Sequence, residues 1–444
     1  MPNTELLLLF VAAIAILLFA IIRLKINPFL VLPGVGLLTG IASGLPLATV
    51  AKLLGDGFGQ TLGSIGMVIG LGIILGNLLA DARATEQIAA LLLRVVGVRR
   101  APLAVNITGY LVSIPVFLNA AFIVFMPLLR DLSRTTRLPL VTLVTAYLVA
   151  GIGTHCIVPP TPGPLAVMGA LKLDPGPFIG WGMLVALLPM VVGLIAGNYF
   201  GKQPAMQIAE DEQTATALTP AADTQPRPSG GLSLFLLLFP ILLILVGSLT
   251  AQFLPETSQA RKVLAFVGDK NVAMLVGLAL AGVMLSNYRR KSFEEIVADG
   301  GANAGLLILI VGAGGSFGAI INGSGIADAL VGALQALNLS MLWLAFLLTA
   351  ILRAAQGSAT VSAVTTASLL APMIAPAGAS PLMVGLAICC GSMCCSFPND
   401  SGFWVISRFS GLNVNQMLRV WTLTSSVAGI AGFVVVLILN ALLG

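Results

Sequence analysis

The sequence predicts an all-α polytopic membrane protein that is built from two inverted-topology repeats. Of its 444 residues, 58% are hydrophobic and 9% are charged, and the mean hydropathy is +1.03, which lies outside the range of soluble domains. Apolar segments close to the ~20 residues needed to cross a bilayer recur along the chain. Motifs of the first half also return in the second half. These three observations define the fold class.

Eight apolar segments are uninterrupted, and each is expected to form a transmembrane helix. The first has no basic residue before it and is followed by Arg23 and Lys25, so we expect it to be retained rather than cleaved as a signal peptide. The eight segments are 6–22, 28–46, 61–80, 178–200, 232–253, 271–286, 301–321 and 418–443.

Four further apolar stretches are broken by polar residues, proline or glycine. Stretches 101–129 and 343–372 are too long for one helix and are expected to be re-entrant hairpins. Stretches 138–171 and 381–410 are expected to cross as interrupted helices that meet at the midplane. Backbone groups in hydrocarbon need partners, so such breaks persist only inside protein or beside a wet cavity. The prediction is therefore about ten spans plus two hairpins.

The basic residues indicate the orientation of this topology. With the amino terminus outside, most of the 22 Lys and Arg residues fall on the inner side, as the positive-inside rule requires. The net charge of +5 is thus attributed to topology, and no nucleic-acid partner is expected. The basic residues expected outside are Lys52, Lys172, Arg261, Lys262 and Lys270.

An internal repeat divides the chain into two units. Gly153-Thr154-His155-Cys156 returns as Gly391-Ser392-Met393-Cys394, and glycine spacing around 70–76 returns around 312–318. Each half has an odd number of expected crossings, so the second half is inverted relative to the first. The units are residues 1–200 and 232–444. The linker 201–231 has no apolar periodicity and is expected in the cytoplasm.

Three ionisable residues are expected at membrane depth: His155, Arg353 and Asp400. Such groups are costly there and are functional candidates by default. In the functional interpretation Arg353 neutralises a substrate anion, and Asp400 or His155 carries a proton. The alternatives are a structural Arg353–Asp400 ion pair and a hydrogen-bonded packing role for His155.

Neutral polar groups around these residues are suited to a polyhydroxylated ligand, although helix packing explains each of them equally well. With Arg353, the expected substrate-binding set is Gln356, Gly357, Ser358, Thr360, Asn119, Thr154, Thr161, Asn399 and Ser401.

No enzyme, metal or cofactor is expected. A lone histidine cannot assemble the usual catalytic constellations. The cluster of Cys389, Cys390, Cys394 and Cys395 suggests a soft-metal site, but small packing residues are the ordinary explanation in a membrane helix. A channel is less expected than a carrier, because one arginine and one aspartate do not form a ring of like charge.

Segments 353–361, 398–404 and 155–164 resemble the signature segments of the gluconate permease family, and the resemblance extends over nearly the whole chain. It implies proton-coupled uptake of gluconate or a related hydroxy acid across the bacterial inner membrane. It also implies a fold similar to the wider ion-transporter superfamily, in which dimers are common and movement is elevator-like.

Three positions depart from the family pattern. Family members usually carry an acidic residue at Asn119, and they often carry histidine at Thr161 and at Phe397. These departures leave the substrate open among gluconate, another sugar acid, a short hydroxy acid and D-serine. They also leave the coupling ion open between proton and sodium.

Overall fold

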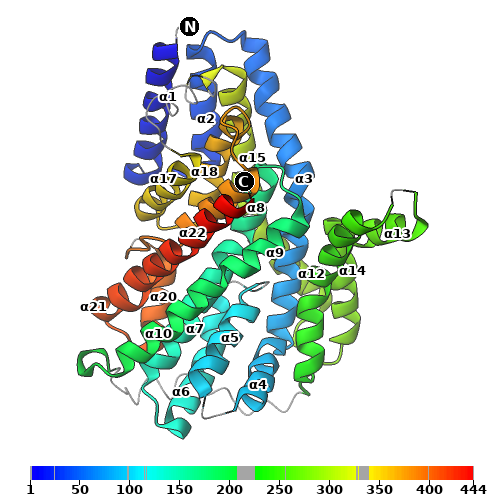
Figure 1. The fold of residues 1–444 in the computed structure, drawn as a ribbon, viewed down its shortest axis with the longest axis vertical. Coiled ribbons are helices and arrows are strands. Elements are labelled where there is room, and N and C mark those ends of the chain that lie inside the picture. The colour runs from blue at the N-terminus through cyan, green and yellow to red at the C-terminus, as the bar shows by residue number, and fades with distance from the viewer. Residues whose placement is uncertain are drawn as a thin grey trace.

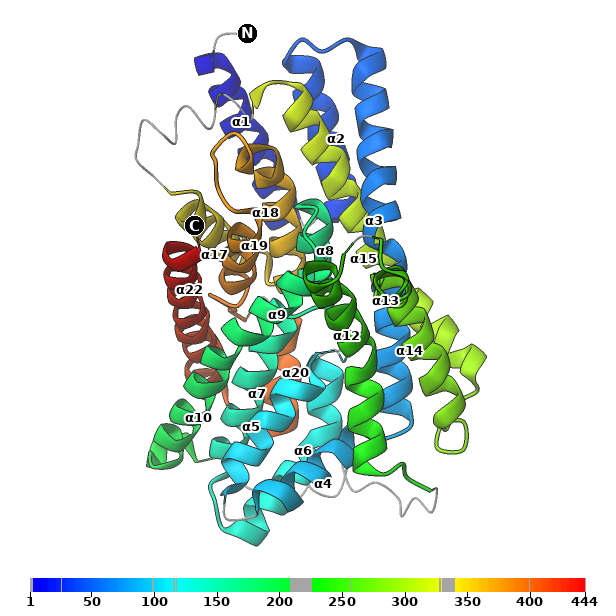
Figure 2. The same cartoon turned by 45° about the vertical axis from the view of Figure 1, so that its right-hand side comes forward.

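The computed structural model describes residues 3–24, 26–97, 100–114, 116, 118–207, 226–255, 257–326, 329, 340–398 and 400–443. In this part of the chain every regular element is a helix (Figures 1 and 2). Most of the predicted linker, together with Asn399, lies outside the described residues.

The first half contains twelve of these elements as the structure bounds them. They are α1 (Asn3–Leu18), the π-helix η1 (Phe19–Arg23), α2 (Pro28–Ala42), α3 (Leu47–Asp81), α4 (Ala84–Val96), α5 (Ala101–Val112), α6 (Leu118–Thr136), α7 (Leu140–Ile157), α8 (Pro162–Ala170), α9 (Pro175–Val185), α10 (Leu187–Gly201) and η3 (Pro204–Met206).

The second half follows with a similar series. Its elements are α12 (Gly230–Phe253), α13 (Gln259–Val267), α14 (Lys270–Met284), α15 (Phe293–Gly323), α17 (Met341–Gln356), α18 (Ala359–Ile374), α19 (Pro381–Gly391), α20 (Ser401–Ser410), α21 (Val414–Met417), the π-helix η4 (Leu418–Leu423) and α22 (Thr424–Leu443).

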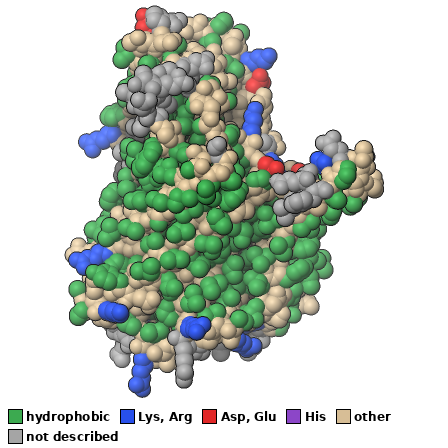
Figure 3. All heavy atoms as spheres, in the orientation of Figure 1, with side chains coloured by type: hydrophobic (Ala, Val, Ile, Leu, Met, Phe, Trp, Pro, Cys, Tyr) green, Lys and Arg blue, Asp and Glu red, His purple; other side chains and the backbone are tan. Residues whose placement is uncertain are grey.

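Several helices have the length and composition of membrane spans. Within the described ranges, five are long and apolar enough to cross a membrane, or up to seven if two bent pairs each count as one span. Other expected spans are shorter apolar helices, such as the 15 residues of α2. Apolar side chains cover the middle of the face drawn in Figure 3, with Lys and Arg near its lower margin. This surface suits a multi-pass membrane protein.

Helices α3 and α15 pack along each other, and α3 extends over much of the long axis (Figure 1). A Cβ atom on Gly57 would lie 2.5 Å from the Gly315 carbonyl oxygen, so both glycines are needed for this close approach. Both helices are longer than the predicted spans 61–80 and 301–321. Helix α15 begins early because Ser292 and Glu295 form a capping box ahead of the apolar run.

The predicted interrupted helices are broken in the structure. Residues 158–161 separate α7 from α8, where Pro159 and Pro160 remove backbone donors. Residues 392–400 separate α19 from α20. The stretch 343–372 is also divided, because Gly357 takes the left-handed conformation at φ 73° between α17 and α18.

The broken elements of the two halves pack against one another. Helix α8 of the first half lies against α18 of the second, and α20 of the second half lies against α6 of the first. These contacts gather the helix ends of both halves in the middle of the molecule, where α8, α18 and α20 are drawn in Figure 2.

Candidate functional site

Arg353 lies in the last turn of α17 and is almost completely buried, with 2% of its surface exposed. Helix α17 ends directly after this turn, because Gly357 takes the left-handed conformation at φ 73° while its N–H still donates to the Arg353 carbonyl at 2.9 Å. Ser358 then begins α18 by accepting the Val361 N–H at 3.3 Å. The glycine and the serine that interrupt the apolar stretch thus fix the arginine beside a helix start.

Asp400 occupies the equivalent place before α20. It is the N-cap of that helix, and its Oδ1 accepts the Gly402 N–H at 2.8 Å. A carboxylate is favoured there because the first N–H groups of a helix have no partners within the helix. The other oxygen, Oδ2, faces Arg353, so one side chain links the start of α20 to the end of α17.

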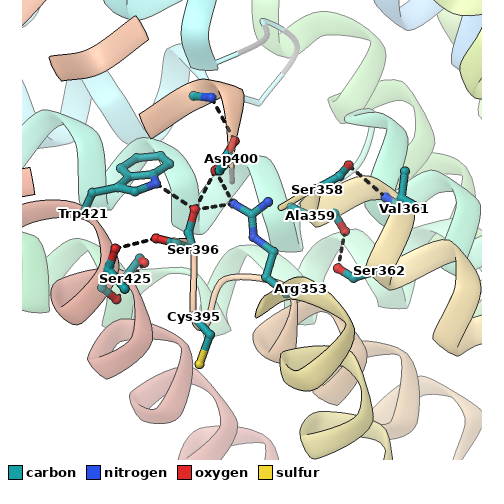
Figure 4. A network of polar contacts seen from close by, with 12 residues as sticks. Arg353, Ser358, Ala359, Val361, Ser362, Cys395, Ser396, Asp400, Trp421 and Ser425 are labelled. Atoms are coloured by element: carbon teal, nitrogen blue, oxygen red, sulfur yellow. Dashed lines mark hydrogen bonds and ion pairs between the residues drawn. The ribbon is translucent and has the colours of Figure 1, made fainter. Parts of the chain in front are cut away.

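The Arg353 and Asp400 side chains form a buried ion pair (Figure 4). Arg353 Nη2 lies 2.6 Å from Asp400 Oδ2 and also donates to Ser396 Oγ at 2.7 Å. Arg353 Nε has no hydrogen-bond partner among the described residues. The Arg353–Asp400 ion pair, one of the two alternatives predicted from the sequence, is therefore present. It uses Nη2 of the guanidinium and leaves Nε without a hydrogen bond to the described residues. The substrate role of Arg353 stays a prediction.

Two residues of this network were not predicted from the sequence. Ser396 donates to Asp400 Oδ2 at 2.5 Å and accepts from Trp421 Nε1 at 2.8 Å. Ser396 lies in the same interruption between α19 and α20 as Asp400. This position was the only feature of the sequence that could have marked Ser396 as a site residue. Trp421 belongs to the π-helix η4, whose i→i+5 hydrogen bonding has no marker in the apolar pattern.

His155 lies in the last turn of α7 and is half-buried. The charges of both Arg353 and Asp400 act on it. The three ionisable residues predicted at membrane depth are thus brought into one cluster by α7, α17 and the start of α20.

Asn119, on α6, lies beside the start of α20. A Cβ atom on Gly402 would lie 3.0 Å from Asn119 Oδ1 and 3.3 Å from Asp400 Oδ1. The first predicted hairpin therefore contributes a neutral amide next to the aspartate. Thr360 lies farther along, where a Cβ atom on Gly163 would be 3.6 Å from its Cα atom.

The other predicted binding residues differ in what their side chains do. Thr154 donates to the Ala150 carbonyl at 3.1 Å, and Thr161 donates to the Val158 carbonyl at 2.7 Å. These local bonds agree with the packing alternative for both threonines, and their contact with a substrate stays a prediction. The side chains of Gln356 and Ser401, like all of Asn399, lie outside the described residues.

Four of the five cysteines are buried. Cys156, Cys389, Cys390 and Cys394 are buried free thiols. Within the ranges given above, no three His, Cys, Asp or Glu residues are placed to hold a metal ion.

The sequence of the chain matches a known protein family and several of its members. Residues 5–442 match the family described as GntP family permease. The chain is 33% identical to the gluconate permease of Zymomonas mobilis over 99% of both chains, and 33% identical to the inner membrane permease YgbN of Escherichia coli K12 over 98% of both. It is 31% identical to the Gnt-II system L-idonate transporter of Escherichia coli K12, over 98% of this chain and 99% of that one.

The fold is similar to that of solved transporter structures. The YdaH transporter of Alcanivorax borkumensis is matched with a TM-score of 0.62 and 17% identity, over 89% of each chain. Since the family match covers nearly the whole sequence, the chain belongs to the GntP permease family and is a multi-pass inner-membrane permease, not an enzyme.

Proposed function

We propose that the protein is a secondary active transporter that imports gluconate or a related sugar acid by proton symport. The observation that carries this proposal is the buried Arg353–Asp400 pair between the ends of broken helices. The names of the gluconate and L-idonate relatives support the class of substrate.

Anion recognition is assigned to the unused part of the Arg353 guanidinium. This group has five N–H donors, and the two on Nη2 are taken by Asp400 and Ser396. In Figure 4 the other terminal nitrogen points away from Asp400, toward the side on which Ser358 lies. A substrate carboxylate would bind this edge, and the start of α18 would supply neutral groups for the substrate's hydroxyls.

Coupling follows from competition for Arg353. While Asp400 is ionised it neutralises the arginine, and a second carboxylate would bring an uncompensated negative charge into a buried site. A proton on Asp400 removes that charge. Arg353 then pairs with the substrate, so one proton and one monoanion enter the site together. His155 is the second proposed proton carrier, because its imidazole is the other group of this cluster that can ordinarily gain and lose a proton near neutral pH.

The proposed architecture places residues 1–200 and 232–444 as inverted repeats with about ten crossings, two re-entrant hairpins and a cytoplasmic linker at 201–231. The reciprocal packing of α8 on α18 and α20 on α6 supports this pairing of halves. Single cysteines placed in the linker should react with a membrane-impermeant reagent from the cytoplasm only. Cysteines at 252–269 should react from outside, and the opposite pattern would exclude the inverted arrangement.

A homodimer is proposed from the family resemblance alone.

The neutral Asn119 beside Asp400 supports a second candidate. With an amide where relatives usually have an acid, the site has fewer titratable groups. This favours a carrier of another small carboxylate or of D-serine with different ion coupling, including sodium.

Transport by purified protein in liposomes distinguishes the two candidates. Uptake of labelled gluconate, L-idonate, D-serine and lactate is measured under an inward proton gradient and, separately, under a sodium gradient. The first proposal expects uphill gluconate uptake with the proton gradient and exchange of labelled for unlabelled gluconate. Uptake driven only by sodium, or uptake of D-serine alone, would replace it with the second. Uptake without trans-stimulation would indicate a channel.

A further inference from the structure

The Ser396 hydroxyl is the centre of the polar network in Figure 4. It lies 2.7 Å from Arg353 Nη2, 2.5 Å from Asp400 Oδ2 and 2.8 Å from Trp421 Nε1. Ser396 is itself 1% exposed, so water does not compete for these bonds. Three elements therefore converge on one oxygen atom: the end of α17, the start of α20 and the π-helix η4.

The direction of each hydrogen bond follows from the chemistry of the partners. The arginine and tryptophan nitrogens can only donate, so the Ser396 oxygen must accept from both. A hydroxyl has one proton and two acceptor positions, so its single proton must go to the Asp400 carboxylate. Every position on Ser396 is then filled. This pattern requires Asp400 Oδ2 to be unprotonated.

Two further hydrogen bonds connect the last span to the segment of residues 395–396. Thr422 Oγ1 donates to the Ser396 carbonyl, and the Cys395 N–H donates to Ser426 Oγ at 2.8 Å. Cys395 has φ 56°, a conformation that costs free energy in a non-glycine residue. Hydrogen bonds with residues of η4 and α22 thus stabilise the backbone beside Ser396 in this costly conformation.

Protonation of Asp400 would disturb this arrangement. A proton on Oδ2 would face Ser396 Oγ, which lies 2.5 Å away and already accepts two hydrogen bonds. Ser396 must release Arg353 or Trp421, and its own proton must turn to another acceptor. The contact between the last span and the site therefore depends on the charge of Asp400.

We propose that Ser396 is a positioning residue that relays the charge state of Asp400 to Trp421, and through Trp421 to the last transmembrane helix. The inference rests on the proposed function in one respect, namely that Asp400 takes up a proton during the cycle. The inference adds that protonation of Asp400 changes the hydrogen bonding of Trp421 and thereby the contact of the last transmembrane helix with the site.

Other charged and titratable groups face the same carboxylate. Arg353 reaches it from α17, and His155 and Cys156 act on the cluster from α7. Helix α6, which packs on α20, presents the neutral Asn119 there, and its Arg130 donates farther away, to the Phe409 carbonyl. A test must therefore separate Asp400 from His155 in particular.

The relay can be tested without any substrate. The chain has four tryptophans, so Trp181→Phe, Trp343→Phe and Trp404→Phe leave Trp421 as the only one. Its fluorescence emission is recorded against pH in reconstituted protein that carries His155→Gln.

We expect a single transition of the Trp421 emission with pH, and we expect it to disappear in Ser396→Ala and in Asp400→Asn. The matched control Ser392→Ala, which removes a buried hydroxyl bound to the Cys389 carbonyl at 2.8 Å, should keep the transition. No transition in the parent protein, or its persistence in Ser396→Ala, would overturn the relay.

A second variant covers the case in which Ser396→Ala does not fold. Trp421→Phe keeps the ring but removes the N–H, so Ser396 can accept from a protonated Asp400 without losing a bond. The proton-loaded state is then favoured, and the pH at which uptake falls to half should rise by about half to one pH unit. Trp404→Phe removes an N–H that donates to the Pro398 carbonyl at 2.7 Å and should leave that pH unchanged. Equal behaviour of the two variants would refute the relay. Because the emission test needs no transport, failure of the proposed function would be recognised separately.

Discussion

Two regions of the molecule solve the problem of crossing a membrane in opposite ways. Helices α3 and α15 are 35 and 31 residues long, so most of their backbone groups are paired within each helix, although α3 bends by 43° between Gly63 and Gly66. The two helices approach each other through glycines. The region of α17, α18, α19 and α20 is made of short helices whose ends meet inside the protein. Among the described residues, the buried Arg353–Asp400 ion pair lies in the second region. Helix ends, with their unpaired backbone groups, are where a membrane protein can hold charge.

The largest expected effect is the loss of accumulation in Asp400→Asn, which tests whether the broken region carries the coupling proton. An amide cannot take up and release a proton, so uphill uptake should be abolished. Exchange of labelled for unlabelled substrate should partly remain, because exchange does not require the proton site to empty. Both are measured in the same vesicles. A variant that still concentrates substrate would assign coupling to His155 or to sodium.

The next largest effect is expected for Arg353→Lys. The charge is kept, but the planar fork that serves Asp400, Ser396 and a substrate carboxylate is lost, so transport at low substrate concentration should fall by roughly 100-fold. Arg408→Lys, at an exposed position on α20, is the control and should transport normally. A folded Arg353→Lys protein with the affinity of the parent would make this arginine purely structural.

A smaller effect, on stability rather than transport mechanism, is expected in the region of long helices. In Gly315→Ala the new Cβ atom would lie 2.4 Å from the Gly57 carbonyl oxygen, so α3 and α15 must move apart. The thermal midpoint of purified protein should fall by at least several degrees. Gly305→Ala, on the same helix with nothing within 4 Å, should not lower it. Equal midpoints would show that the glycine contact is not needed for packing.

The smallest effect is expected at the exposed end of α15, where Lys291 Nζ lies 2.7 Å from Asp299 Oδ2. Asp299 raises the pKa of Lys291 above its usual 10.5. A raised lysine pKa adds stability below that range, and the gain is lost only as the pH rises through the folded-state value. Asp299→Asn should therefore change the thermal midpoint little, and equally at pH 6 and pH 8, since surface pairs contribute weakly. A large or pH-dependent change would contradict this.

The sequence predicted the broken region better than its internal contacts. Pro159 and Pro160 forbid a continuous helix, and Arg353 and Asp400 are conspicuous because charged residues are rare in this chain, so a joint site was predictable. The Trp421–Ser396 bond was not, because it depends on the rotation of a helix by one extra residue. The lengths of α3 and α15 were also missed, since hydropathy marks where a helix enters lipid and not where its hydrogen bonding begins.

The separation of the site residues along the chain has a consequence for biosynthesis. Arg353 precedes its partners Ser396 and Asp400 by 43 and 47 residues, and Trp421 follows Ser396 by 25 more. At synthesis rates of about 5–20 residues per second, the guanidinium leaves the ribosome roughly 2–9 seconds before its carboxylate. During that interval α17 carries an uncompensated charge and must wait in water, at the lipid surface or within the insertion machinery. We therefore expect α17 to reach its final depth only once α20 has been made, so that the two settle together rather than in the order of the chain.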